Sequence, residues 1–92
     1  MEFHFYRPGE REYVCVCEII EQTEDRVVLR TSREPIAEIC IEPVYSEDKI
    51  GVDEMRPSMV RVRFNGELVG AGYYRKLGDI IDVVAFYTSE SK

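Results

Sequence analysis

The stretch V-R-V-R-F-N-G-E-L-V, residues 60–69, consists of two runs of alternating side chains separated by Asn65-Gly66. A two-residue type I′ turn requires positive φ at both central residues, and Asn-Gly adopts that conformation readily. The alternating runs on either side predict β-strands, so the stretch predicts a hairpin. A two-residue turn also sets a register in which Val62 faces Val69 and Arg61 faces Gly70.

This register divides the hairpin into two faces. The face predicted to join a core carries Val60, Val62, Phe64, Val69 and Ala71. The opposite face carries Arg61, Arg63, Leu68, Gly70 and Gly72. There, two guanidinium groups lie beside backbone without side chains, which another chain or an anion can approach closely. We predict a partner-binding site formed by Arg61, Arg63, Gly70, Gly72 and Lys76. The alternative is a pair of solvated arginines at a bend in the strand.

Four segments upstream of the hairpin have the composition of strands. They are rich in β-branched and aromatic residues, and turn signals such as Pro8-Gly9 and the polar run 22–25 separate them. The predicted strands are 3–7, 13–21, 26–31 and 36–42. Strands joined by short turns pair antiparallel.

Two segments fit more than one interpretation. Residues 46–56 fit a short helix that begins at Ser46 and ends before Pro57, although Gly51 weakens that prediction. Residues 78–87 fit a strand or a helix capped by Asp79, and their β-branched residues favour the strand. Together the segments predict one domain, 1–92, that is mainly β: an antiparallel meander of six to seven strands forming a small sandwich or barrel. An α+β fold with one or two short helices is the alternative.

The predicted strand 13–21 is mostly apolar on both faces. One face carries Tyr13, Cys15, Cys17 and Ile19, and the other carries Val14, Val16 and Ile20. A strand with one solvated face alternates with polar residues, so this pattern predicts cover on both sides, by a second layer or a second subunit. The run 80–87 is similar, and the two offer more apolar surface than one small core covers. We therefore predict a homodimer.

The charge balance narrows the classes of partner. Eighteen acidic and twelve basic residues give a formal net charge of −6, the wrong sign for a protein that neutralises nucleic-acid phosphates. The net charge is −8 over 1–54, +4 over 55–77 and −2 over 78–92, so the basic hairpin region complements the acidic N-terminal half. There is no apolar run of membrane-spanning length and no secretory pattern at the first residues. We expect a cytoplasmic protein with neither nucleic acid nor membrane as partner.

Three cysteines and one histidine are the potential metal ligands. By residue type, Cys15, Cys17, Cys40 and His4 could close a tetrahedral zinc site, but a C-x-C pair within a strand differs from the turn-borne pairs of structural zinc sites. Reduced thiols packed in a core are the favoured interpretation, and His4 is interpreted as a polar strand residue. We therefore predict no cofactor. Binding of a metal or small ligand through Cys15, Cys17 and Cys40 remains an alternative function.

No arrangement of residues in the sequence marks a catalytic site. A histidine-based nucleophile would depend on His4 alone. Asp79 and Asp82 lie against an apolar run, where a carboxylate could act as acid or base, but solvent exposure is the simpler interpretation and lets Asp82 keep an edge strand from pairing. We predict a non-enzymatic protein-interaction domain, bound to itself as a homodimer or to another protein. A further alternative is an acidic inhibitor that binds a basic surface.

Overall fold

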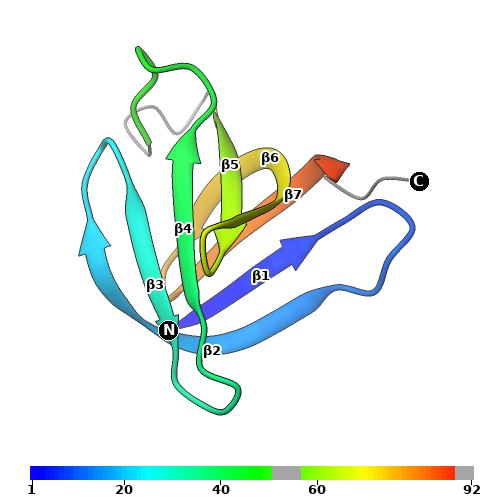
Figure 1. Ribbon diagram of the computed structural model, residues 1–92. Coiled ribbons are helices and arrows are strands. Elements are labelled where there is room, and N and C mark those ends of the chain that lie inside the picture. The colour runs from blue at the N-terminus through cyan, green and yellow to red at the C-terminus, as the bar shows by residue number, and fades with distance from the viewer. Residues whose placement is uncertain (51–56, 89–92) are drawn as a thin grey trace.

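The computed structural model describes residues 1–50 and 57–88, and for 86–88 it describes the backbone alone. All regular elements in this part of the chain are strands, and there is no helix (Figure 1). The strands are β1 (Glu2–Tyr6), β2 (Tyr13–Gln22), β3 (Val27–Thr31), β4 (Glu38–Pro43), β5 (Ser58–Phe64), β6 (Glu67–Leu77) and β7 (Ile80–Thr88). The mainly-β prediction is confirmed, and the run after Asp79 is a strand. Of the predicted helix, residues 46–50 have no helical structure, and 51–56 lie outside the described residues.

The seven strands close into a barrel in the order β1 to β7. Each strand pairs antiparallel with the next one along the chain, as a meander requires. The barrel closes through a parallel pairing of β1 with β7, in which Glu2 lies opposite Ile80 and Tyr6 opposite Val84. The predicted barrel is thus present, and its closure adds a parallel pair that the turn signals did not indicate.

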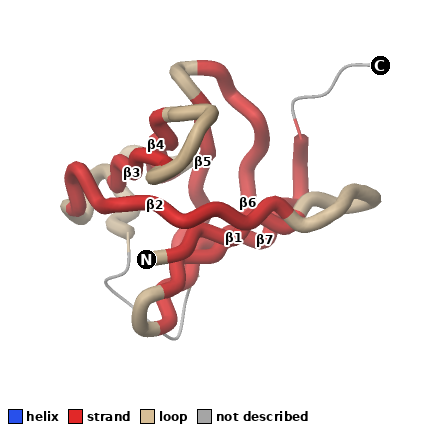
Figure 2. Tube along the Cα trace, turned by 90° about the horizontal axis from the view of Figure 1, so that it is seen from below, coloured by secondary structure: helices blue, strands red, loops and turns tan. Residues whose placement is uncertain are grey.

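Two long strands, β2 and β6, each belong to two sheets. β2 pairs with β1 through residues 13–16 and with β3 through 17–22. β6 pairs with β5 through 67–74 and with β7 through 70–77. In Figure 2, β5 and β6 accordingly run across the direction of β1 and β2. Bulges interrupt both strands, and a bulge lets a strand bend and twist more strongly. The barrel therefore resembles two sheets packed across one core and joined at the bent strands.

Inward-facing side chains fill the barrel. The largest fully buried ones come from every strand except β2 and β6: Phe3, Phe5, Val27, Leu29, Ile39, Ile41, Val60, Val62, Ile81 and Val83. Each stabilises the fold by about 1.5–3 kcal/mol relative to an exposed position. Ile50, from the β4–β5 connection, is also buried in this core, and its N–H donates to the carbonyl oxygen of Glu24 at 2.8 Å. The interior is a packed core, as expected for a narrow barrel.

The Asn65-Gly66 turn forms as predicted, with φ of 52° and 85° at the two residues. Phe64 faces Glu67 and Arg63 faces Leu68, also as predicted.

Beyond these first two pairs the predicted register of the hairpin is wrong. A bulge makes Val69 an extra residue, so Val62 faces Gly70 and Val60 faces Gly72, while Arg61 faces Ala71. Gly70 and Gly72 therefore lie on the same face as the buried valines of β5 and not beside the arginines. The physical reason is curvature: β6 must bend between two sheets, and a bulge supplies the bend.

Candidate interaction surface

The structure does not bring together the five residues of the sequence-predicted site. Arg61 and Arg63 lie side by side on the outer surface of β5, but Gly70 and Gly72 face the core side of β6. Lys76 is exposed near the end of β6, opposite buried Ile81, where β6 has passed beyond the end of β5. The predicted coupling of two guanidinium groups to bare glycine backbone is therefore absent.

Gly72 has a structural role at this position. A Cβ atom there would lie 2.3 Å from the carbonyl oxygen of Val84 and 2.5 Å from the Cα atom of Ala85. Real Cβ atoms do not approach backbone so closely, and glycine permits this contact between strands. Gly72 is needed for the packing of β6 against β7.

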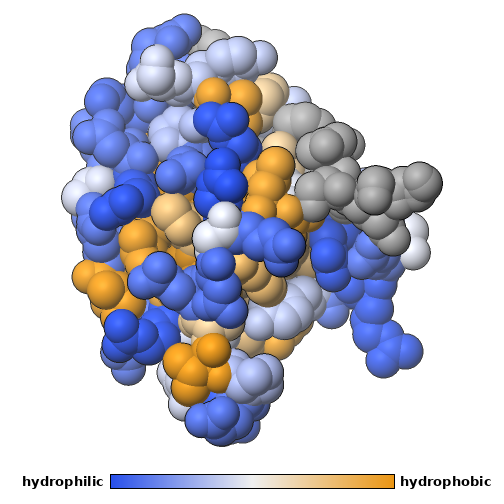
Figure 3. Space-filling view, in the orientation of Figure 1, coloured by the Kyte–Doolittle hydropathy of each residue, from blue (hydrophilic) through white to orange (hydrophobic). Residues whose placement is uncertain are grey.

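The outer surface of β3, β4, β5 and the second half of β2 is densely charged, and we call it the charged wall. Its charged residues are Glu18, Glu21, Arg26, Arg30, Glu38, Glu42, Arg61 and Arg63. Opposite charges alternate across the strands: Arg30 lies between Glu18 and Glu38. Figure 3 shows hydrophilic residues between smaller apolar patches on the side of the molecule that faces the viewer in Figure 1.

Two arginines of the charged wall, Arg26 and Arg63, pair with glutamates of the same wall. Arg26 Nη2 donates to Glu21 Oε1 at 2.8 Å, and Arg63 Nε donates to Glu42 Oε1 at 3.4 Å. Arg61 Nη2 donates to the carbonyl oxygen of Val44 at 3.4 Å. Cross-strand pairs of this kind stabilise a sheet modestly and leave less charge to attract another molecule.

The opposite side of the barrel has a different outer surface, formed by β1, β7, the first half of β2 and the second half of β6. We call it the apolar wall. The pairing places its outward residues in three rows: Leu77, Ile80, Glu2 and Val16; Arg75, Asp82, His4 and Val14; and Tyr73, Val84 and Tyr6.

The apolar wall concentrates exposed hydrophobic side chains. Six of the ten exposed large hydrophobic residues in the described chain lie on it, with exposed fractions of 37–53%: Tyr6, Val14, Val16, Tyr73, Leu77 and Val84. Four strands about 4.8 Å apart and about five residues long give roughly 300 Å² in projection. This area includes the charged middle row, and the exposed apolar residues lie in the two outer rows and at the β2 end of the middle row.

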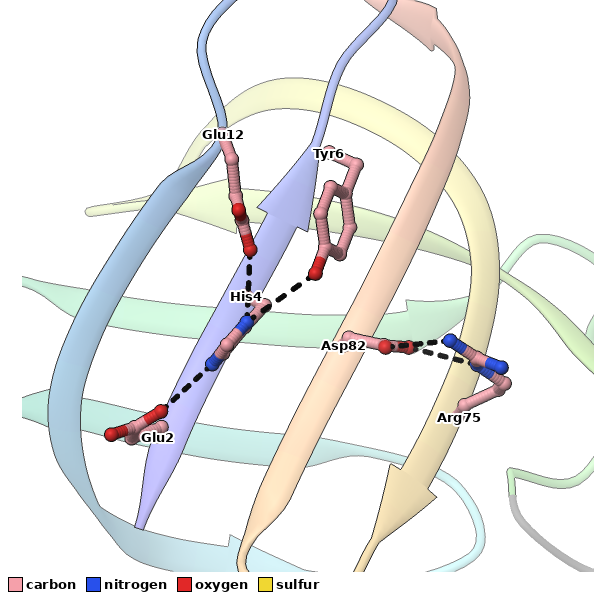
Figure 4. Close-up of polar contacts among 6 residues, drawn as sticks. All are labelled: Glu2, His4, Tyr6, Glu12, Arg75 and Asp82. Atoms are coloured by element: carbon pink, nitrogen blue, oxygen red, sulfur yellow. Dashed lines mark hydrogen bonds and ion pairs between the residues drawn. The ribbon is translucent and has the colours of Figure 1, made fainter.

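An ion pair with a buried carboxylate lies in the middle row of the apolar wall. Asp82 points outward from β7 but is only 4% exposed, so the predicted solvated aspartate at a sheet edge is wrong. β7 is paired on both sides, and Arg75 covers the carboxylate. Arg75 Nε and Nη2 donate to the two carboxylate oxygens at 3.2 and 2.9 Å (Figure 4). This bidentate contact holds the guanidinium in one orientation on the wall.

His4 lies next to this ion pair and contacts two carboxylates (Figure 4). Its Nε2 lies 2.9 Å from Glu2 Oε1, and its Nδ1 lies 2.9 Å from Glu12 Oε2. The hydrogen bond with Glu2, followed by the contact with Glu12, raises the pKa of His4 above its ordinary value, although partial burial acts in the opposite direction. Both ring nitrogens of His4 therefore contact carboxylates.

The three cysteines are free thiols and do not form a common site. Cys15 and Cys17 face the interior along β2, whereas Cys40 lies between the buried Ile39 and Ile41 and therefore faces outward. Burial raises the pKa of Cys17 to about 11 and also raises the pKa values of Cys15 and Cys40. In residues 1–50 and 57–88 no cluster of three His, Cys, Asp or Glu side chains is placed to hold a metal ion.

Sequence reasoning missed the apolar wall as a surface. Val14 and Val16 were noted as apolar on a second strand face, and they are exposed in the single chain. The residues of β6, β7 and β1 join them only through the parallel β1–β7 pairing, which no local pattern indicates.

Comparison with known proteins adds no relationship: no family model, no curated protein and no solved structure matches this chain. Among the described residues no helix has the length and apolar character needed to cross a bilayer.

Proposed function

We propose that this protein is a non-enzymatic interaction domain that self-associates as a homodimer through the apolar wall. The observation that carries the proposal is the concentration of exposed apolar side chains on one side of the barrel, around a guanidinium that is already held in place. Tyrosine and arginine are the residue types that most often dominate binding energy at interfaces, and Tyr6, Tyr73 and Arg75 supply them here. Fixing Arg75 in advance lowers the entropy cost of using it.

A second copy of the chain fits the chemistry of this wall. The wall carries a guanidinium on its β6 side and the carboxylates of Glu2 and Glu12 on its β1–β2 side. An isologous interface uses the same patch twice, and a two-fold axis that lies in the interface and runs along the strands places the β6 side of one copy over the β2 side of the other. In this arrangement the glutamates of each copy lie near Arg75 of the other copy, and the exposed apolar residues of the two walls pack against each other.

The alternatives fit the geometry less well. Binding of a metal through Cys15, Cys17 and Cys40 would require thiols from opposite sides of the barrel wall. An acidic inhibitor needs unpaired carboxylates over a broad surface, whereas Glu21 and Glu42 are paired with arginines of the same chain. The net charge of −6 favours a protein over a nucleic acid as partner. Three free thiols suit a reducing compartment, which supports a cytoplasmic location as part of the proposal.

The proposal is tested by measuring the mass of the protein in solution. In sedimentation equilibrium the wild type is expected to show twice the chain mass of 10.7 kDa at micromolar concentration. Leu77→Glu places a charge among the exposed apolar residues of the wall and is expected to raise the dimer dissociation constant at least about tenfold.

Ile36→Glu is the matched control. Ile36 is about as exposed as Leu77, 49% against 53%, but it lies in the β3–β4 connection, away from the apolar wall. This variant is expected to dimerise like the wild type. A wild type that stays monomeric up to about 100 μM, or equal effects of the two substitutions, would overturn the proposal.

A further inference from the structure

His4 occupies the middle row of the apolar wall and is surrounded by acidic groups from several elements. Glu2 and Tyr6 lie on its own strand, Glu12 on the β1–β2 connection, and Asp82 opposite it on β7. Arg75 of β6 binds Asp82 and leaves the two glutamates to the histidine. The Tyr6 hydroxyl lies 3.5 Å from His4 Nδ1. The hydrogen bond with Glu12 is the main cause that raises the pKa of Tyr6, so the Tyr6 hydroxyl stays neutral near pH 7.

The protonation state of His4 decides whether this cluster is fully hydrogen-bonded. A protonated imidazole donates from both ring nitrogens, one to each glutamate, and the three groups together carry a net charge of −1. A neutral imidazole has one N–H, so the other ring nitrogen points its lone pair at a carboxylate, and the cluster carries −2. Water can relieve this mismatch on an open surface, but a covered interface excludes water.

We propose that self-association through the apolar wall is coupled to protonation of His4, so that each copy holds a proton on this residue in the dimer and the dimer weakens as the pH rises. The inference rests on the proposed function, because it assigns a regulation to the same surface. In the dimer the partner's wall covers the cluster and excludes water, so a neutral imidazole that turns a lone pair toward a carboxylate has no water to relieve that contact.

The sign follows from linkage between proton binding and association. Covering the cluster stabilises its less charged, fully hydrogen-bonded form, so His4 binds its proton more tightly in the dimer than in the monomer. Association therefore takes up protons. The dimer is at full strength below the pKa that His4 has in the monomer, and it weakens as the pH rises from there through the higher pKa that His4 has in the dimer.

The composition of the chain makes the effect easy to assign. His4 is its only histidine. Burial raises the pKa values of all three thiols, which moves their titration further above neutral pH. The His4→Gln variant assigns the effect to this residue directly.

The test is sedimentation equilibrium at constant ionic strength from about pH 6 to about pH 8.5. The wild-type dimer is expected to have at least a tenfold higher dissociation constant at the upper pH. His4→Gln keeps an amide donor but cannot titrate, and its dissociation constant is expected to be independent of pH. Glu12→Gln replaces one of the two carboxylates with an amide that can donate to an unprotonated ring nitrogen, and its dissociation constant is expected to change less between the two pH values than that of the wild type. Glu34→Gln, outside the wall, should behave as the wild type.

The outcomes separate this inference from the proposed function. A wild-type dimer whose dissociation constant does not change with pH overturns the coupling and leaves the dimer intact. A pH dependence that survives in His4→Gln assigns the effect to another group and also overturns the coupling. Absence of any dimer at every pH overturns the proposed function itself.

Discussion

The charged wall and the apolar wall are built from similar strands around one core, yet different kinds of residue occupy their outward positions. On the charged wall, acids and arginines alternate across strands, as in Glu18, Arg30 and Glu38. On the apolar wall, the outer rows carry exposed valine, leucine and tyrosine, and charge is gathered in the middle row. Charges on both walls are paired within the chain, so the walls differ in where apolar side chains are exposed. That difference is the basis for proposing the apolar wall as the side that binds.

One pair on each wall shows the same contrast at the level of single residues. Arg63 and Glu42 are both about one-third exposed and meet at 3.4 Å. Arg75 is half exposed, but the Asp82 side chain beneath it is only 6% exposed, and they meet at 2.9 Å. If the arginine is removed, water can hydrate the carboxylate of Glu42, whereas water reaches the carboxylate of Asp82 poorly.

The largest expected effect concerns Gly72, where β6 passes from one wall to the other. In Gly72→Ala the added Cβ must push β6 away from the backbone of β7, and the free energy of unfolding is expected to fall by about 3 kcal/mol or more. Urea denaturation measures this. Gly78→Ala is the control: Gly78 has φ of 60° but open space around it, so about 1 kcal/mol is expected. Equal losses of unfolding free energy in the two variants would show that β6 and β7 can move apart at Gly72 at no cost.

A smaller effect is expected from removing the arginine of each pair. Arg75→Met leaves the carboxylate of Asp82 buried without a partner and is expected to lower the melting temperature by at least about 5 °C. Arg63→Met leaves Glu42 accessible to water, and a decrease of less than about 3 °C is expected. Calorimetry of the monomeric Leu77→Glu background keeps association out of the comparison. A larger loss for Arg63→Met would reverse the ranking of the two walls.

The smallest effect concerns the thiols and checks which side of the barrel each one faces. Cys40 belongs to the outer surface of the charged wall, while Cys17 is 2% exposed and has a pKa of about 11. With iodoacetamide at about pH 8, Cys40 is expected to react at least tenfold faster than Cys17. The Cys40 thiol is more accessible to the reagent, and the raised pKa of Cys17 keeps that residue from forming the reactive thiolate. Mass spectrometry of peptides over time gives the two rates. Comparable rates would contradict the inward placement of Cys17.

Local patterns in the sequence predict the strands well. Asn65-Gly66 has the positive φ values that a tight turn needs, and the alternating runs around it are strands. The β-branched residues after Asp79 decide correctly for a strand over a helix. These features depend on residues close together in the chain, where propensity and turn chemistry act directly.

The proposed binding surface could not be predicted in the same way. The bulge at Val69 lets β6 bend as a closed barrel requires, and the local sequence of the turn does not encode that requirement. The bulge places Gly70 and Gly72 on the face opposite to Arg61. Asp82 is buried because Arg75 and His4 lie beside it, and His4 arrives there only through the parallel closure. Residues from both ends of the chain form the apolar wall, and single-strand periodicity carries no information about their proximity.

The parallel pairing of β1 with β7 also has a consequence for how the barrel assembles. Neighbouring strands joined by tight turns can pair through residues that are close in the sequence. The β1–β7 pairing, which we call the seam, joins residues separated by nearly the whole chain. Until it forms, the first and last strands each offer an unpaired edge, and such edges recruit strands from other molecules. The seam is thus the late step of folding. It is also the point at which the β7 of one molecule can take the place of another's and produce a domain-swapped pair.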